Sequence, residues 1–174
     1  MSDIKLKTKG YNQEDDLERV INYALREREE DVEWVWWTGL GVGTDSAEEV
    51  IHDMRLVKQV YGKTDGKQLW QLIISIKRYQ HARSKEDYNH KKEDEAIYCR
   101  LIGMEICNLI YNEGFQNIVA MHTDTENYHL HFVINSINIA TGNHIRCAYT
   151  FEKKIGDYLK DNYRNLQWNC NYER

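Results

Sequence analysis

Three histidines in this 174-residue chain have the type and spacing of a metal-binding site. His129 and His131 are two residues apart in a strand-forming segment, so both side chains would project from one face of a strand. His122 ends the preceding apolar segment, and a tight turn would bring it beside the pair. Three neutral imidazoles on one side of a sheet can bind a divalent ion and leave positions open for substrate.

We therefore predict a metal site at His122, His129 and His131. The nitrogen ligands alone do not choose among Mg, Mn, Zn and Co. Phosphate oxygens of a substrate would favour a harder ion, so Mg or Mn is expected. Asp124 lies in the turn between the two segments, where its carboxylate could orient a ligand imidazole and raise its basicity.

Tyr23 is a second candidate for chemistry. It lies at the edge of the apolar stripe of a predicted amphipathic helix, where its hydroxyl would be more accessible than that of a core tyrosine. Arg19 and Arg26, four residues before and three after, would be its neighbours on the helix and could hold a phosphate. On these residues alone, a structural tyrosine at the rim of the core is the simpler interpretation.

The elements that must position these side chains alternate between helix and strand. Apolar periodicity predicts helices near 14–28, 46–60, 93–112 and 151–166, and strands near 33–38, 69–76, 117–123, 129–139 and 144–149. Gly39, Gly41 and Gly43 are expected to end the first of these strands. This order predicts an α+β fold in which helices pack on a central, largely antiparallel sheet of about five strands. No repeat or linker divides the chain, so one domain over residues 1–174 is expected.

Composition narrows the class of protein. The chain has 23 Lys and Arg against 28 Asp and Glu, a net charge of −5, which argues against a protein that coats DNA non-specifically. Its apolar runs are far shorter than the ~20 residues of a membrane span, and no signal peptide opens it, so a cytoplasmic protein without membrane insertion is expected. The four cysteines have no C-x-x-C spacing and are expected to be reduced.

One basic stretch, residues 77–92, could bind single-stranded DNA. Lys77 and Arg78 begin it, and Tyr79 and Tyr88 could stack on bases between its cations. The alternative is an ordinary solvated loop. Arg146, expected beside the histidine hairpin, is a further candidate for a DNA contact.

Together these motifs resemble the conjugative relaxases, the mobilization-protein branch of the His-hydrophobic-His nucleases. The resemblance spans roughly residues 17–146. It rests on His122-Thr123-Asp124, His129-Leu130-His131, Val133-Ile134-Asn135-Ser136-Ile137-Asn138, Thr141-Gly142, Ile21-Asn22-Tyr23-Ala24, Leu72-Ile73-Ile74-Ser75 and Tyr61-Gly62-Lys63. Gln71 stands where relatives commonly carry a histidine, and it could hydrogen-bond DNA.

The resemblance implies a metal-dependent, site- and strand-specific DNA nickase that initiates conjugative transfer from a bacterial plasmid or integrative element. Tyr23 would attack a phosphodiester at the transfer origin, forming a 5′-phosphotyrosine link and a free 3′-hydroxyl. The implied partners are single-stranded transfer-origin DNA, an accessory mobilization protein and a coupling ATPase. Relatives are commonly longer, so the chain is expected to be a minimal or excised relaxase domain.

Two other functions stay open at this point. A rolling-circle replication initiator or transposase nuclease would use the same metal chemistry with a downstream tyrosine, for example Tyr149, Tyr158 or Tyr163. A decayed nuclease that only binds DNA is the second alternative.

Overall fold

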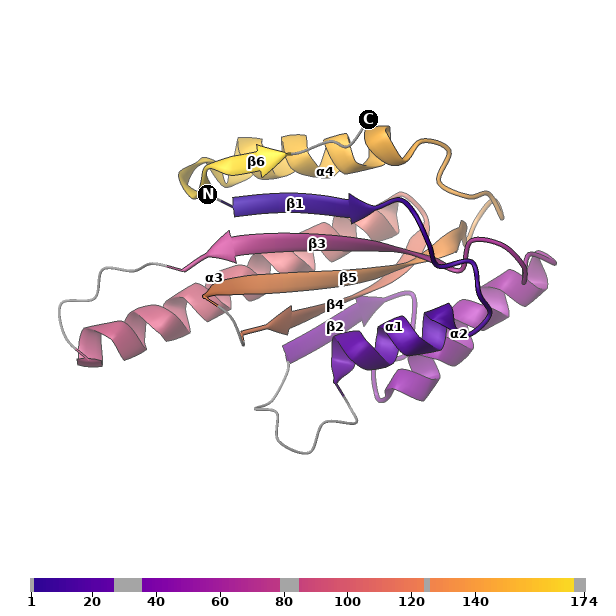
Figure 1. The fold of residues 1–174 in the computed structure, drawn as a ribbon, viewed down its shortest axis with the longest axis horizontal. Coiled ribbons are helices and arrows are strands. Elements are labelled where there is room, and N and C mark those ends of the chain that lie inside the picture. The colour runs from indigo at the N-terminus through magenta and orange to yellow at the C-terminus, as the bar shows by residue number, and fades with distance from the viewer. Residues whose placement is uncertain (1, 27–35, 79–84, 124–125, 171–174) are drawn as a thin grey trace.

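The computed structural model describes residues 2–26, 36–78, 85–123 and 126–170, which form one six-stranded sheet with helices on both faces (Figure 1). The strands are β1 (Ser2–Lys7), β2 (Trp36–Leu40), β3 (Leu69–Lys77), β4 (Phe115–His122), β5 (Asn127–Asn138) and β6 (Trp168–Cys170). The helices are α1 (Asp16–Leu25), α2 (Ala47–Val60), α3 (Lys85–Asn112) and α4 (Ala148–Asn162), followed by a 3₁₀ turn at Arg164–Leu166.

The strand order in the sheet is β2-β4-β5-β3-β1-β6. Only β1 and β6 pair in parallel, and the other neighbours are antiparallel. The predicted α+β class and largely antiparallel sheet are confirmed. β5 lies in the interior of the sheet and pairs with β4 on one side and β3 on the other. Pairing on both sides fixes the register of β5.

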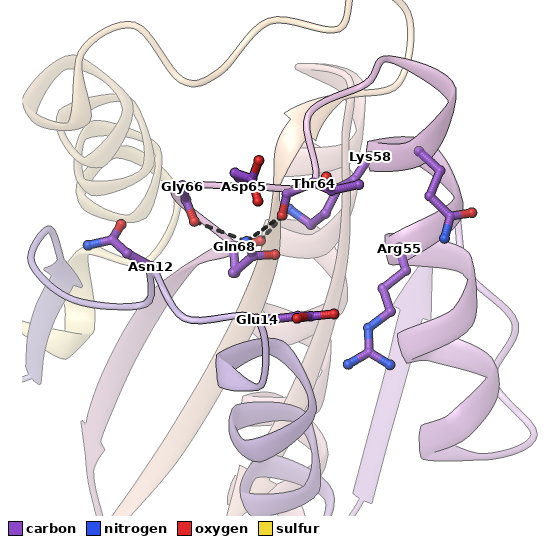
Figure 2. A pocket seen from close by; sticks show the side chains of 9 residues that line it. Asn12, Glu14, Arg55, Lys58, Thr64, Asp65, Gly66 and Gln68 are labelled. Carbon is purple, nitrogen blue, oxygen red and sulfur yellow. Dashed lines mark hydrogen bonds between the residues drawn. The ribbon is translucent and has the colours of Figure 1, made fainter.

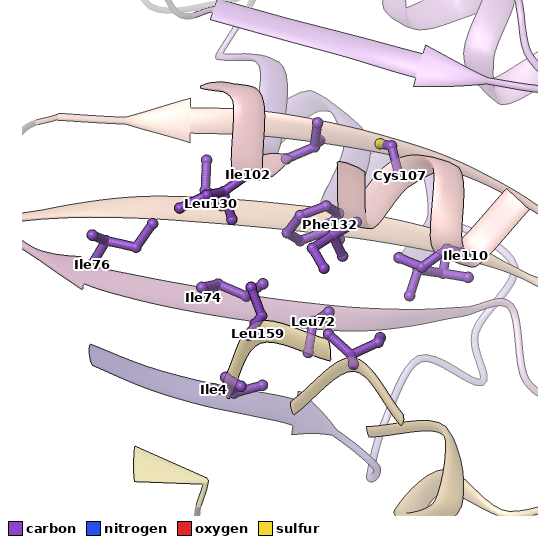
Figure 3. Close-up of a cluster of buried hydrophobic side chains, with 14 of the residues drawn as sticks. Ile4, Leu72, Ile74, Ile76, Ile102, Cys107, Ile110, Leu130, Phe132 and Leu159 are labelled. Atoms are coloured by element: carbon purple, nitrogen blue, oxygen red, sulfur yellow. The ribbon is translucent and has the colours of Figure 1, made fainter. Parts of the chain in front are cut away.

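The two faces of the sheet are covered differently. On one face, α3 and α4 pack on apolar side chains such as Leu72, Leu130 and Phe132, which Figure 3 shows gathered between strands and helices. On the other face, α1 and α2 contact β4 and β5, where Val133 and other buried side chains form a second core. Lys5 of β1 lies exposed on this second face, so the β1 side of the face is not covered by the helices.

Local chemistry explains the helix ends on the second face. Ser46 caps α2 by accepting a hydrogen bond from the Glu49 backbone N–H at 3.2 Å. α1 buries an apolar stripe that includes Leu17 and Ile21. It ends at Arg26, whose φ of 51° places a non-glycine residue in the left-handed region.

Several sequence-based boundaries were wrong. β1 was not predicted, although alternate residues of Ser2–Lys7 are buried, the pattern of a half-buried strand. β2 does not stop at Gly39, because that glycine allows close contact with β4. α3 begins at Lys85, before the expected residue 93.

The strand expected at 144–149 is also wrong. Only a single bridge joins Ile137 to His144. Helix α4, which buries Phe151, Ile155 and Leu159 at helical spacing, already begins at Ala148. Among the described residues, the thiols of Cys99, Cys107 and Cys147 are free. Cys99 and Cys107 are buried, and Cys147 is exposed. Within the described residues, no helix is long and apolar enough to cross a membrane.

Candidate functional site

The β4–β5 hairpin gathers the three histidines on the second face. His122 pairs with His129 in register, and His131 is the next residue of β5 on the same face. The ring centroids of His122 and His131 are 4.3 Å apart, and those of His129 and His131 are 6.2 Å apart. Strand alternation therefore produces the cluster, because Leu130 between the paired histidines points into the opposite core.

Tyr23 lies directly against this cluster. Its ring centroid is 5.9 Å from that of His122 and 6.0 Å from that of His131, both in edge-on arrangements. The side of α1 that packs on the sheet carries Leu17 and Ile21, which leaves Tyr23 at the flank with 54% of its surface exposed. The phenol is thus beside the imidazoles and open to a macromolecular substrate.

His122 ties the end of α1 to the end of β4. Its Nε2 is 2.7 Å from the Ala24 carbonyl oxygen, and because a carbonyl only accepts, Nε2 carries the proton. Nδ1 then accepts from the Arg26 guanidinium at 3.1 Å. Arg26, whose backbone is in the left-handed region, is therefore also the residue whose guanidinium contacts the histidine cluster.

His131 is 8% exposed, and its Nδ1 is buried without a hydrogen-bond partner among the described residues. Burial, then the His122 and His129 rings, lower the pKa of His131 to about 3, so the imidazole is neutral at physiological pH. An unpartnered buried nitrogen is costly, and a metal ion would satisfy it.

The histidines fit a divalent ion by ligand type and by this unpartnered nitrogen. As they stand, no group of three or more His, Cys, Asp or Glu side chains in the described part of the chain is arranged to hold a metal. The Arg26 guanidinium lies at His122 Nδ1 and would have to move for that nitrogen to become a ligand.

A cavity of about 320 Å³ borders Tyr23 and His131. Gln71 and Arg19, both predicted as DNA contacts, line it. Gln71 is buried and its Oε1 accepts a hydrogen bond from the Tyr11 hydroxyl at 2.7 Å. Arg19 forms an ion pair with Asp16 at the start of α1.

Lys7 and Tyr11 also line this cavity, and the sequence analysis missed both. The alternation of Ser2–Lys7 was the available signal for Lys7, since it places that lysine on the face of Gln71, its partner in the β1–β3 register. Nothing local in the sequence indicates the contact of Tyr11 with Gln71, because the two lie 60 positions apart.

The other predicted DNA contacts divide into two groups. Lys77 is exposed where β3 ends beside the hairpin turn, and Arg78 donates to the Thr123 carbonyl oxygen while lying 4.6 Å from the Tyr128 ring centroid. Both are therefore at the histidine end of the sheet. Asp124 and Tyr79, like the side chains of residues 85–92, lie outside the described residues.

Arg146 does not lie beside the histidines, so that expectation was wrong. It lines a cavity of about 420 Å³ together with Asn138, at the far end of β5. Asn138 lies seven positions after His131 in β5, about 23 Å at ~3.3 Å per residue.

A further cavity, of about 330 Å³, lies near the start of β3 (Figure 2). At its edge the buried Lys58 of α2 donates to the Gln68 carbonyl oxygen and to Ser136 Oγ, both at 2.6 Å. Burial lowers the pKa of Lys58 to about 8. None of the predicted site residues lines this cavity.

The tyrosines of the alternative function lie elsewhere. Tyr158 and Tyr163 donate hydrogen bonds to Glu105 of α3, and α3 and α4 cover the face opposite the histidines. Tyr149 is exposed on α4.

Comparison with known proteins identifies the family of this chain. Residues 23–166 match the family model described as "Relaxase: MobA/VirD2-like, nuclease domain". The chain belongs to this relaxase family. The matched part of the relaxase domain begins at Tyr23 and includes His122, His129 and His131. The resemblance identified from the sequence motifs is confirmed.

Curated relatives of this relaxase domain include two from Staphylococcus aureus named Protein rlx. They are 32% identical over 142 residues and 31% identical over 148 residues. The alignments cover 82% and 85% of this chain but 36% and 38% of the relatives, so the chain spans little more than a third of their length. A solved structure described as "Molecular Basis of Vancomycin Resistance Transfer in Staphylococcus aureus" is similar with a TM-score of 0.49 and 12% identity, covering 100% of this chain and 99% of that one.

Proposed function

We propose that this relaxase domain nicks one DNA strand at a specific site by attack of Tyr23 on a phosphodiester. The observation that carries the proposal is the position of an exposed phenol 5.9 and 6.0 Å, between ring centroids, from two imidazoles of a histidine cluster. A nucleophile beside potential metal ligands, on a face open to a long substrate, suits phosphodiester transfer.

In the proposed step, Tyr23 Oη forms a bond to the phosphorus while the bond to the 3′-oxygen breaks. The phenol loses its proton and the leaving oxygen gains one, which leaves a 5′-phosphotyrosine and a free 3′-hydroxyl. The phosphoester is kept in the enzyme–DNA link, so the same hydroxyl can reverse the reaction and rejoin the strand.

His122, His129 and His131 would hold a divalent ion, with Mg or Mn as the proposed metal. When bound, such an ion would polarise the phosphate and neutralise charge developing on its oxygens. The hydrogen bond from His122 to the Ala24 carbonyl fixes the ring orientation in the manner of a metal-ligand histidine. Asp124 keeps its proposed role of orienting a ligand imidazole.

Cations around the cluster would position the DNA. Arg26 lies at His122 Nδ1 and would contact the phosphate as it approaches Tyr23. Arg19 and Gln71 line the adjoining cavity, and Lys77 and Arg78 lie where β3 ends beside the hairpin turn. These side chains are the proposed contacts to single-stranded DNA.

We infer that this relaxase domain acts in starting conjugative transfer or mobilization of a plasmid or integrative element. Single-stranded transfer-origin DNA is the proposed substrate. An accessory mobilization protein and a coupling ATPase are the proposed partners.

The test is a covalent-adduct assay with a single-stranded transfer-origin oligonucleotide and Mn²⁺, resolved on a denaturing gel. The unaltered chain should give a protein–DNA band, and Tyr23→Phe should abolish it while the fold is retained. Tyr149→Phe, which removes another exposed hydroxyl, should keep the band. Full linkage in Tyr23→Phe together with loss in Tyr158→Phe would replace this proposal with the downstream-tyrosine mechanism.

A further inference from the structure

We propose that the cavity beside Tyr23 and His131 binds an unpaired nucleobase adjacent to the nicked phosphate and selects bases that present a keto oxygen. This inference rests on the proposed function, since it names the base class that the same site reads. The cavity volume of about 320 Å³ is within the usual range of small-ligand pockets.

Gln71 is the group in the cavity best placed to read a base. Its side chain lines the cavity although the residue is only 2% exposed. The Tyr11 hydroxyl donates to Gln71 Oε1 at 2.7 Å, which fixes the orientation of the amide. The amide nitrogen, which carries two N–H donors, is therefore the part of Gln71 left for a ligand.

The cations of the cavity reinforce this donor character. The ammonium of Lys7 and the guanidinium of Arg19 have no acceptor capacity. Guanine O6 and thymine O4 are acceptors, whereas adenine and cytosine carry amino groups at the corresponding positions. A keto base would pair with the Gln71 amide, but an amino base would place donor against donor and leave this buried amide unpaired.

The position of the cavity suits a base next to the nick. Gln71 and Ile73 are alternate residues on one face of β3, about 7 Å apart along the strand. Ile73 pairs in register with His131, which contacts the Tyr23 ring. A phosphate at Tyr23 and a base at Gln71 are thus separated by about the reach of one nucleotide.

The experiment compares fluorescein-labelled dodecamers of deoxyuridine and deoxycytidine, whose bases differ in carrying O4 or an amino group at position 4. A homopolymer presents the same base in every register, and EDTA in the buffer prevents cleavage. Fluorescence anisotropy should show roughly fivefold tighter binding of the deoxyuridine strand, the effect of about one hydrogen bond. Equal affinities, or tighter binding of the deoxycytidine strand, would overturn the inference.

Two variants test whether the preference for deoxyuridine comes from Gln71 in the cavity. Gln71→Glu replaces the donor with an acceptor and should shift the ratio toward deoxycytidine. Because Gln71 is buried, Tyr11→Phe gives a second test that removes only a hydroxyl: it releases the amide and should bring the ratio close to one. Tyr61→Phe, which loses a hydroxyl bonded to the Ile139 carbonyl, is the control and should keep the ratio.

A preference that survives Tyr11→Phe unchanged would place the selection elsewhere and overturn the inference. Failure of the underlying function has a different signature. In that case neither dodecamer binds, or DNA becomes linked to the protein without Tyr23.

Discussion

Both ring nitrogens of His122 form hydrogen bonds at the point where the end of α1 meets the sheet. The Ala24 carbonyl accepts from one nitrogen and the Arg26 guanidinium donates to the other. The same side chain therefore holds Tyr23 close to the cluster and keeps a cation at the site where a metal ion would bind. In the proposed reaction, an arriving phosphate would give that guanidinium another partner, so substrate binding would be coupled to release of His122 Nδ1.

The proposed metal can be tested at one histidine. His129→Ala, or EDTA with the unaltered chain, should lower the cleavage rate by about 100-fold or more, because the charge on the phosphate is no longer neutralised. DNA affinity should change by less than about tenfold, since cationic side chains provide most of it.

A gel-based assay measures the cleavage rate, and fluorescence anisotropy measures the DNA affinity separately. His52→Ala, which removes an exposed histidine of α2, is the matched control and should behave as the unaltered chain. Undiminished cleavage in EDTA would remove the metal from the mechanism.

At the scale of elements, strand alternation and hairpin geometry were enough to group the histidines from sequence. Two-residue spacing predicted the shared face of His129 and His131, and the polar turn predicted the return of His122. The bounds of β2 were not predicted, because they depend on a partner distant in the chain, whereas β1 was missed although the alternation of Ser2–Lys7 is a local signal. Gly39 is an example: as a glycine it was expected to end the strand, yet it pairs with Ile118 of β4 within β2.

A pair of glycine substitutions tests this interpretation of Gly39. A Cβ added there would lie 2.8 Å from Ile118 Cγ2 and 3.1 Å from the Asn117 carbonyl oxygen, so Gly39→Ala should destabilise the fold by about 1–3 kcal/mol. At Gly103 in α3 the nearest atom would be at 3.4 Å, and Gly103→Ala should stabilise by about 0.5–1 kcal/mol. Urea denaturation measures both, and equal effects would contradict the close-contact argument.

The buried Lys58 of α2 should make the free energy of unfolding depend on pH in the alkaline range. Its pKa is lowered by burial from 10.5 to about 8, so between these values the unfolded chain binds more protons and stability rises with pH. Relative to Lys58→Met, which cannot titrate, the unaltered chain should gain about 2 kcal/mol between roughly pH 7.5 and 9.5.

Unfolding free energies of the two proteins at both pH values give this difference directly, and cancel the titration of other groups. A constant difference would mean that Lys58 stays charged in the folded protein above pH 9.

For the molecule as a whole, the net charge of −5 hides an uneven distribution. On the histidine face, Lys5 and Lys7 of β1 extend the cationic surface of Arg19 and Arg26 across the sheet. We infer that this local field guides DNA to the histidine face although the net charge of the chain is negative.

Salt dependence measures the size of this field. If Lys5 and Lys7 each neutralise one phosphate, Lys5→Gln/Lys7→Gln should reduce the slope of log affinity against log salt for single-stranded DNA by about 1.4. Lys153→Gln/Lys154→Gln makes the same charge change on exposed α4 residues and should leave the slope unaltered. Identical slopes for the two double variants would show that β1 does not contact DNA.

Because β5 is paired on both sides, its residues cannot shift register independently of β3 and β4. An insertion or deletion of one residue within β5 that shifts its register would turn both paired histidines toward the apolar core under α3 and α4, and Leu130 and Phe132 toward the histidine face. Descendants of this gene can therefore exchange amino acids along the strand, but single-codon gains or losses there should be purged by selection.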